Sequence, residues 1–282
     1  MRRCLPPDLL AGLALLALAA LLLFGVPLLP FYDAQGQNLA AALVPPLSAV
    51  DGRTFLLGTD PLGRDLLSRI SLGGRVSLLI AGSAVLLSLA AGTALGVVAG
   101  YFRGAVENAI MGLADLQLAI PRVLLLIAAA AILGPSVGVL AGLLGLTSWV
   151  SYGRVARALA LSLRQREFVL AAETLGASPA WTMRRHLLPN VLPQMAIIGS
   201  FEFGQIVVLE ASLSYLGLGV PPPLPSLGMM ISEGQTYLEI SPWISLFPGV
   251  AIFLLVAGAQ FTSQFLTAEG DGGADAASLS SG

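Results

Sequence analysis

The chain has 282 residues, of which 56% are apolar and 11% are charged, and its mean hydropathy is +0.86. Soluble globular proteins carry roughly 25% charged residues, so most of this surface cannot face water. The composition excludes a soluble enzyme and a disordered chain, and the net charge of −2 argues against the basic surface that nucleic acid binding requires. With one cysteine, Cys4, and one histidine, His186, neither an intrachain disulfide nor a cysteine-based or histidine-rich metal site is possible.

Apolar segments long enough to cross a bilayer, which takes about 20 residues, recur along the sequence. The uncharged run 9–30 predicts the first span. It exceeds the apolar core of a signal peptide, so we expect an uncleaved anchor rather than a cleaved leader. Five more spans are expected near 76–100, from 105 to the Gly134-Pro135 break, and near 136–160, 191–213 and 243–266. The predicted fold class is therefore all-α, a polytopic membrane protein with about six transmembrane helices.

The arginines predict the orientation, because basic residues concentrate on the cytoplasmic side. With a cytoplasmic N-terminus (residues 1–8), nine arginines lie inside and four outside, and both termini are cytoplasmic. Residues 31–74 are then an extracytoplasmic segment, and 75–267 form the transmembrane core with a cytoplasmic loop at 161–190. The tail 268–282 has too few apolar residues to fold alone, so we expect it to be disordered.

The cytoplasmic loop has the pattern of two short helices at an angle. The first is expected from about Leu163 to Leu175, and Gly176 stands where a helix end needs a left-handed residue. Ser178 is a good N-cap and Pro179 falls at the first helical position of the second helix. The pattern alone leaves two interpretations open: an interfacial hairpin resting on the bilayer, or an element that docks into a cleft of a partner.

This loop resembles the coupling loop of the membrane subunits of ABC importers. That family has Glu-Ala-Ala, three residues, Gly, nine residues, a residue that is often Ile, any residue, and Leu-Pro. Leu170 stands here in place of Glu. The stretches 57–78 and 209–228 are similar to segments of the dipeptide, oligopeptide and nickel permeases of that family, in the same order. By this resemblance, ATPase coupling is assigned to the following residues: Arg166, Ala171, Ala172, Glu173, Gly176, Arg185, His186 and Pro189.

The resemblance implies one permease subunit in a bacterial inner membrane, importing di- or oligopeptides, with nickel as the alternative substrate. It implies a second homologous permease as a heterodimer partner, two cytoplasmic ATPases and an extracytoplasmic binding protein. ATP and Mg²⁺ would be held by the ATPases, and no cofactor by this chain, which has no Walker motif and no lysine to build one. We therefore expect a transport subunit in the lipid bilayer, not an enzyme, with no nucleic acid partner.

A second motif lies in the extracytoplasmic segment. Arg64 follows Asp60 by four residues and Arg69 follows Asp65 by four, which is the spacing of helical ion pairs. Two interpretations remain open: a self-neutralised structural cap over the second span, or a contact for the incoming binding protein. The motif comprises Gly58, Thr59, Asp60, Gly63, Arg64, Asp65 and Arg69.

Carboxylates within membrane spans are costly and often functional. Asp115, Glu202 and Glu210 are therefore candidates for a translocation pathway, the alternative being a pairing with an arginine such as Arg122 or a position at the level of the lipid headgroups. A rival class of function, a channel or secondary transporter, would need internal repeats and broken helices in matching halves, and no paired half is evident. A membrane scaffold without transport is the other rival, and the coupling-loop pattern argues against it.

Overall fold

The computed structural model describes residues 7–279, and the chain is a bundle of helices with one small sheet. The helices are α1 (Pro7–Ala20), α2 (Leu66–Phe102), α3 (Gly104–Ala119), α4 (Arg122–Leu133), α5 (Val137–Leu163), α6 (Glu167–Thr174), α7 (Pro179–Thr182), α8 (Leu188–Tyr215), α9 (Leu227–Gln235) and α10 (Trp243–Leu279). Short 3-10 or π-helical turns lie at Leu21–Gly25, Val26–Leu28, Leu39–Ala41 and Met183–Leu187, and β1 (Ser48–Val50) pairs antiparallel with β2 (Arg53–Phe55).

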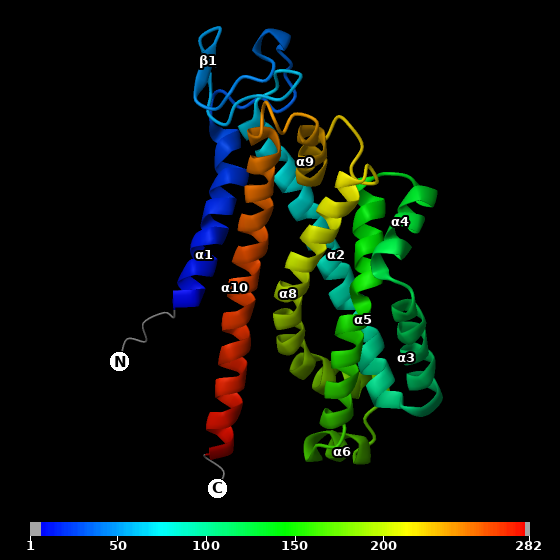
Figure 1. Ribbon diagram of the computed structural model, residues 1–282. Coiled ribbons are helices and arrows are strands. Elements are labelled where there is room, and N and C mark those ends of the chain that lie inside the picture. Colours follow the sequence, from blue (N-terminus) through cyan, green and yellow to red (C-terminus); the bar gives the residue numbers. More distant parts are fainter. Residues whose placement is uncertain (1–6, 280–282) are drawn as a thin grey trace.

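The long helices run roughly along one another from one end of the molecule to the other (Figure 1). In this view α1 and α10 lie side by side at one edge, and α3 and α4 lie along α5 at the other. One end is covered by residues 29–65, which we call the cap, and α6 lies at the opposite end. The start of α1 and the end of α10 point towards the α6 end.

The core of the bundle is the close packing of α2 on α5. Glycines at one-turn spacing make this approach possible: a Cβ at Gly92, Gly96 or Gly100 would lie 2.3–2.6 Å from a backbone oxygen of α5. The GxxxG pair Gly92–Gly96 therefore packs within the subunit, as small residues do between membrane helices. Buried Ile80, Leu144 and Ile206 then fill the space where α2, α5 and α8 meet.

The number of spans differs from the six expected. Among the described residues, four helices are long and apolar enough to cross a membrane, at Leu9–Leu28, Leu66–Phe102, Pro179–Tyr215 and Trp243–Gln264. The third expected span is not one straight helix, because α3 and α4 meet at an angle of 87° around Ile120 and Pro121. Counted as one bent span, they make a fifth. The expected fourth span exists as α5, but it is not among the helices apolar enough to qualify by composition.

The C-terminal tail also differs from the expectation of disorder. The helix α10 continues to Leu279, so residues 268–279 are helical, while 280–282 lie outside the described residues. An existing helix can be prolonged without the unfavourable nucleation step that a separate helix needs, which composition alone does not reveal.

The cap is built from tight turns and one hairpin. Asp51 and Gly52 connect β1 to β2 with φ of 50° and 78°, the left-handed values that two-residue hairpin turns require. The cap ends at Asp65, whose carboxylate accepts from the Ser68 backbone N–H at 2.9 Å and so caps the start of α2.

Candidate functional site

The loop between α5 and α8 folds as a helical hairpin close to the predicted form. The helix α6 ends at Thr174, and Gly176 follows in the left-handed region with φ of 85°. Ser178 then caps α7 by accepting from the Trp181 backbone N–H at 3.3 Å, with Pro179 at the first helical position. The predicted turn chemistry at Gly176, Ser178 and Pro179 is therefore confirmed.

The two arms of the hairpin differ from the expectation in length. The first arm begins at Glu167 rather than near Leu163, because α5 itself extends to Leu163 and the chain turns over the next three residues. The second arm does not end before the next span. It continues from Pro179 to Tyr215 through a wide π-helical turn at Met183–Leu187, which ends two residues before Pro189. The second arm and α8 therefore form one continuous helix.

Buried apolar side chains hold the hairpin against the bundle. Val169 of α6 and Leu187 of the second arm are both fully buried, in a cluster that includes Val97 and Tyr101 of α2. Arg164 strengthens this attachment: its guanidinium donates to the Tyr101 backbone carbonyl and lies 4.9 Å from the centre of the Tyr101 ring. The hairpin is thus anchored on one face.

The opposite face of the hairpin is apolar and open. Leu175 is 89% exposed, and Phe168 and Trp181 are about half exposed. The His186 ring lies between the two arms, 5.7 Å from the Phe168 ring and 5.1 Å from the Trp181 ring. These side chains surround a hollow of about 810 Å³. A surface of this kind fits an apolar cleft on another protein better than it fits water.

The predicted coupling residues divide into three groups. Ala171, Ala172, Gly176 and His186 line the hollow, and Arg185 lines a neighbouring hollow of about 500 Å³. Arg166 and Pro189 are exposed outside it. Glu173 lies instead 3.8 Å from Arg164 Nε, on the side that faces the bundle. The structure places Glu173 with the attachment of the hairpin rather than with its open face.

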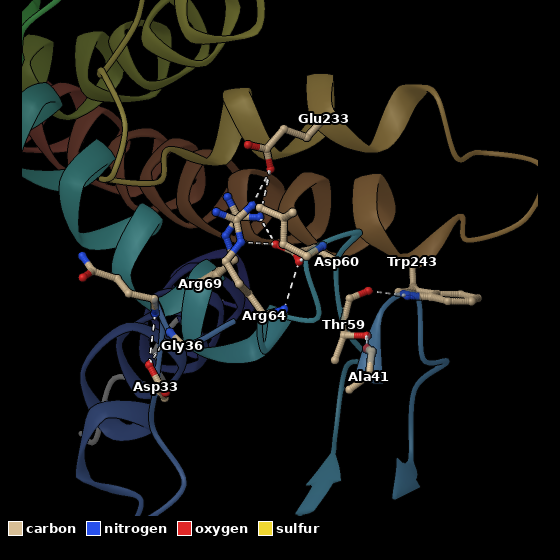
Figure 2. Close-up of polar contacts among 11 residues, drawn as sticks. Asp33, Gly36, Ala41, Thr59, Asp60, Arg64, Arg69, Glu233 and Trp243 are labelled. Carbon is tan, nitrogen blue, oxygen red and sulfur yellow. Dashed lines mark hydrogen bonds and ion pairs between the residues drawn. The ribbon is translucent and has the colours of Figure 1, made fainter. Parts of the chain in front are cut away.

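The second predicted motif forms a buried ionic cluster at the junction of the cap and α2 (Figure 2). The carboxylate of Asp60 is fully buried and accepts from Arg64 Nε at 2.6 Å and from Arg69 Nη1 at 2.5 Å. Two backbone N–H groups, of Leu62 and Arg64, donate to its other oxygen. Glu233 of α9 completes the cluster, at 2.9 Å from Arg69. Three separate segments of the chain therefore meet at Arg69.

The ion pairs differ in part from those read off the spacing. Asp60 and Arg64 do pair, although they lie in a turn before α2 rather than in a helix. Asp65 does not pair with Arg69 through its side chain; it caps α2, and Arg69 turns to Asp60 and Glu233. Spacing along a helix could not reveal Glu233, because it lies 164 residues further along the chain.

The remaining residues of the motif, Gly58, Thr59 and Gly63, lie in close contact with neighbouring backbone. Gly63 has a φ of 70°, and a Cβ there would lie 1.7 Å from the Asn38 backbone oxygen. Gly58 has a φ of 81°, and a Cβ there would lie 2.6 Å from the Val44 backbone oxygen. The Thr59 hydroxyl donates to Ala41 O at 2.6 Å, and the Thr59 carbonyl accepts from the Trp243 indole at 3.4 Å (Figure 2).

The three candidate pathway carboxylates lie in different surroundings. Asp115 is 67% exposed and pairs with Arg154 at 2.6 Å. Glu210 is fully buried and accepts from the hydroxyls of Ser77 and Ser214 at 2.7 and 2.8 Å. Glu202 is 6% exposed and lies within electrostatic range of Arg122 without forming an ion pair with it. The structure does not bring the three together.

No group of three or more His, Cys, Asp and Glu side chains that could hold a metal ion occurs within residues 7–279.

Comparison with known proteins identifies the family. Residues 92–267 match the family described as the binding-protein-dependent transport system inner membrane component. The chain belongs to this family. It is 36% identical to the dipeptide transport system permease protein of Haemophilus influenzae over 88% of this chain and 84% of that protein. It is 32% identical to the oligopeptide transport system permease protein of Bacillus subtilis over 88% of this chain and 80% of that one.

A solved structure supports the fold. A chain of the MetNI methionine ABC transporter in inward-facing conformations superposes with a TM-score of 0.52 at 20% identity, covering 71% of this chain and 95% of that one. The family is a transport component rather than an enzyme: the inner-membrane part of a binding-protein-dependent transport system. The all-α polytopic architecture and the family resemblance predicted from the sequence are therefore confirmed.

Proposed function

We propose that this chain is one permease subunit of an ATP-driven importer of di- or oligopeptides. The names of the relatives support this substrate class, because relatives that share 32–36% identity over most of this chain include dipeptide, glutathione and oligopeptide permeases. A binding protein delivers the peptide at the cap side of the bundle. A second, homologous permease completes the membrane part, and both termini lie in the cytoplasm.

The open hairpin is the observation that carries the coupling role. One face of the hairpin packs against α2 and α5. On its other face, Leu175 and Phe168 are exposed around a hollow lined by alanines. An ATPase subunit binds this face, one under each permease, and holds the ATP and Mg²⁺ that this chain does not bind. When ATP binding draws the two ATPases together, the hairpins follow.

The continuity of the second arm with α8 explains how that movement reaches the membrane. The helix from Pro179 to Tyr215 passes from the docking face to the far end of the bundle, with only the wide turn at Met183–Leu187 between. A tilt of the hairpin therefore tilts α8 and opens the bundle to one side or the other. Asp115, Glu202 and Glu210 are proposed to contribute polar groups to the path that opens.

Gentle extraction of the tagged chain, with mass spectrometry of copurifying proteins, tests the assembly. We expect a second permease and ATPases with Walker motifs, and ATP-dependent uptake of a labelled dipeptide after reconstitution with the binding protein. Recovery of the chain alone, active in liposomes without ATP, would replace this proposal with a secondary transporter.

A further inference from the structure

A narrow apolar groove lies between the end of α2 and the second arm of the hairpin. Its volume is about 280 Å³. The helix α2 contributes Ala94, Val97 and Val98, of which Ala94 is exposed and Val98 is partly exposed. The residues that the second arm and the start of α8 contribute are apolar except for Arg184. The groove is therefore an apolar channel with a single cation at its edge.

The hollow of about 500 Å³ that Arg185 lines is next to this groove. Two residues, Ala180 and Arg184, line both of them. None of the described residues that line either one is acidic. Arg184 and Arg185 are both exposed, and neither has an ion-pair partner among the residues whose side chains the structure describes. The apolar groove thus adjoins two positive charges that nothing described here compensates.

The position of the groove along α2 corresponds to the edge of a bilayer. The sequence of α2 is uncharged between Arg75 and Arg103. Val98 and Ala94 precede Arg103 by five and nine residues, or about 8 and 14 Å at the rise of a helix. The groove therefore lies in the outer part of the hydrocarbon layer, which is about 30 Å thick, and Arg184 lies near the level of the headgroups.

This arrangement is complementary to an anionic phospholipid. A guanidinium binds a phosphate through paired hydrogen bonds, and Arg184 and Arg185 supply two guanidinium groups at one hollow. An acyl chain fits the apolar groove through van der Waals contacts with its walls. Basic pockets beside membrane helices bind anionic headgroups in this way. A zwitterionic lipid fits less well, because its own cation would lie beside the two arginines.

We propose that the groove and the basic hollow together bind one anionic phospholipid. Its phosphate contacts Arg184 and Arg185, and one acyl chain lies between α2 and the second arm. The lipid joins α2 to the arm that continues as α8, so it contributes to holding the hairpin against the bundle. This site is additional to the coupling role proposed above and does not depend on which substrate the importer carries.

Native mass spectrometry of the purified complex, titrated with phosphatidylglycerol or phosphatidylcholine, tests the charges. Arg184→Gln removes one cation at the headgroup, so we expect the affinity for one phosphatidylglycerol to fall about fivefold and phosphatidylcholine binding to stay unchanged. Arg103→Gln is the matched control, because Arg103 is also exposed at the end of α2 but lines neither the groove nor the hollow. Unchanged phosphatidylglycerol binding by Arg184→Gln, or an equal loss in both variants, would overturn the proposal.

The acyl-chain groove is tested separately from the charges. Ala94→Phe fills the groove from α2 and should lower the affinity for phosphatidylglycerol about fivefold, because the chain loses contacts with the walls. Ala90→Phe, at an exposed position one turn earlier that does not line the groove, should bind as the wild type does. Wild-type binding by Ala94→Phe, or displacement of the lipid by glycerol 3-phosphate, would indicate a site for the headgroup alone and overturn the proposal. If Ala94→Phe does not assemble, the comparison of Arg184→Gln with Arg103→Gln still decides.

Discussion

Arg69 donates a hydrogen bond to Glu233 at 2.9 Å, and this contact joins the start of α2 to α9 across 164 residues of sequence. Arg69 itself is 3% exposed, so its charge depends on its partners rather than on water. Asp60 is the fully buried partner, and Glu233 is 26% exposed. The two acids therefore contribute unequally, although both contact the same guanidinium.

This inequality gives the first prediction. Asp60→Asn removes the buried negative charge that the Arg69 guanidinium contacts. It should lower the free energy of unfolding by about 3–5 kcal/mol. Glu233→Gln keeps Asp60 in place and removes a partly exposed partner, so we expect a loss of about 1 kcal/mol or less. Thermal unfolding of the purified complex ranks the two variants, and an equal or reversed ranking would contradict the buried role of Asp60.

The same cluster shows what sequence patterns can and cannot predict. The spacing from Asp60 to Arg64 predicted one ion pair correctly, because both residues lie within a single turn of the chain. The partners of Arg69 depend on how α9 folds back over α2, and no local pattern contains that information. In the sequence, Glu233 stands out only as one of the few acidic residues between the last two expected spans, and nothing there links it to Arg69.

The glycines of α2 give a second prediction with a control on the same helix. A Cβ at Gly96 would lie 2.3 Å from the Gly153 carbonyl oxygen, whereas a Cβ at Gly82 would meet no atom within 4 Å. Gly96→Ala should therefore separate α2 from α5 and cost about 1–3 kcal/mol of stability. Gly82→Ala should be neutral or stabilise the helix by about 0.5–1 kcal/mol. Unfolding in detergent measures both, and an unaffected Gly96→Ala would mean that the contact with α5 is loose.

The hairpin was the part of the site most accessible to sequence reasoning, for a physical reason. Gly176 and Pro179 act through their own backbone geometry and Ser178 through a hydrogen bond to Trp181, three residues on, so all three roles are local and all three are as predicted. The merging of the second arm with α8 was not predicted, because the sequence pattern treated the loop and the next span as separate helices. A π-helical turn changes the hydrogen-bond register there and lets the helix continue.

Gly176 supplies the third prediction. Its φ of 85° disfavours a β-branched residue, and no atom lies within 4 Å of the position where a Cβ would stand. Gly176→Val should therefore strain the turn by about 1–2 kcal/mol without disturbing the bundle. We expect normal insertion, continued ATP hydrolysis by the ATPases and lost peptide uptake.

Gly176→Asn is the matched control, because asparagine tolerates the left-handed region. That variant should retain most of the uptake. Reconstituted liposomes report hydrolysis and uptake together, and normal uptake by Gly176→Val would count against docking of the ATPase at this turn.

The final prediction concerns Glu202, the carboxylate near the middle of α8. Glu202→Gln keeps the shape of the side chain but leaves the charge of Arg122 without a compensating anion nearby. A buried, uncompensated charge favours whichever transport state exposes it to water, so the cycle should slow while assembly is preserved. We expect uptake to fall about tenfold, which corresponds to ~1.4 kcal/mol. Glu239→Gln, in the exposed connection between α9 and α10, is the control and should transport normally. Wild-type uptake by Glu202→Gln, with intact copurification of the partners, would remove Glu202 from the transport mechanism.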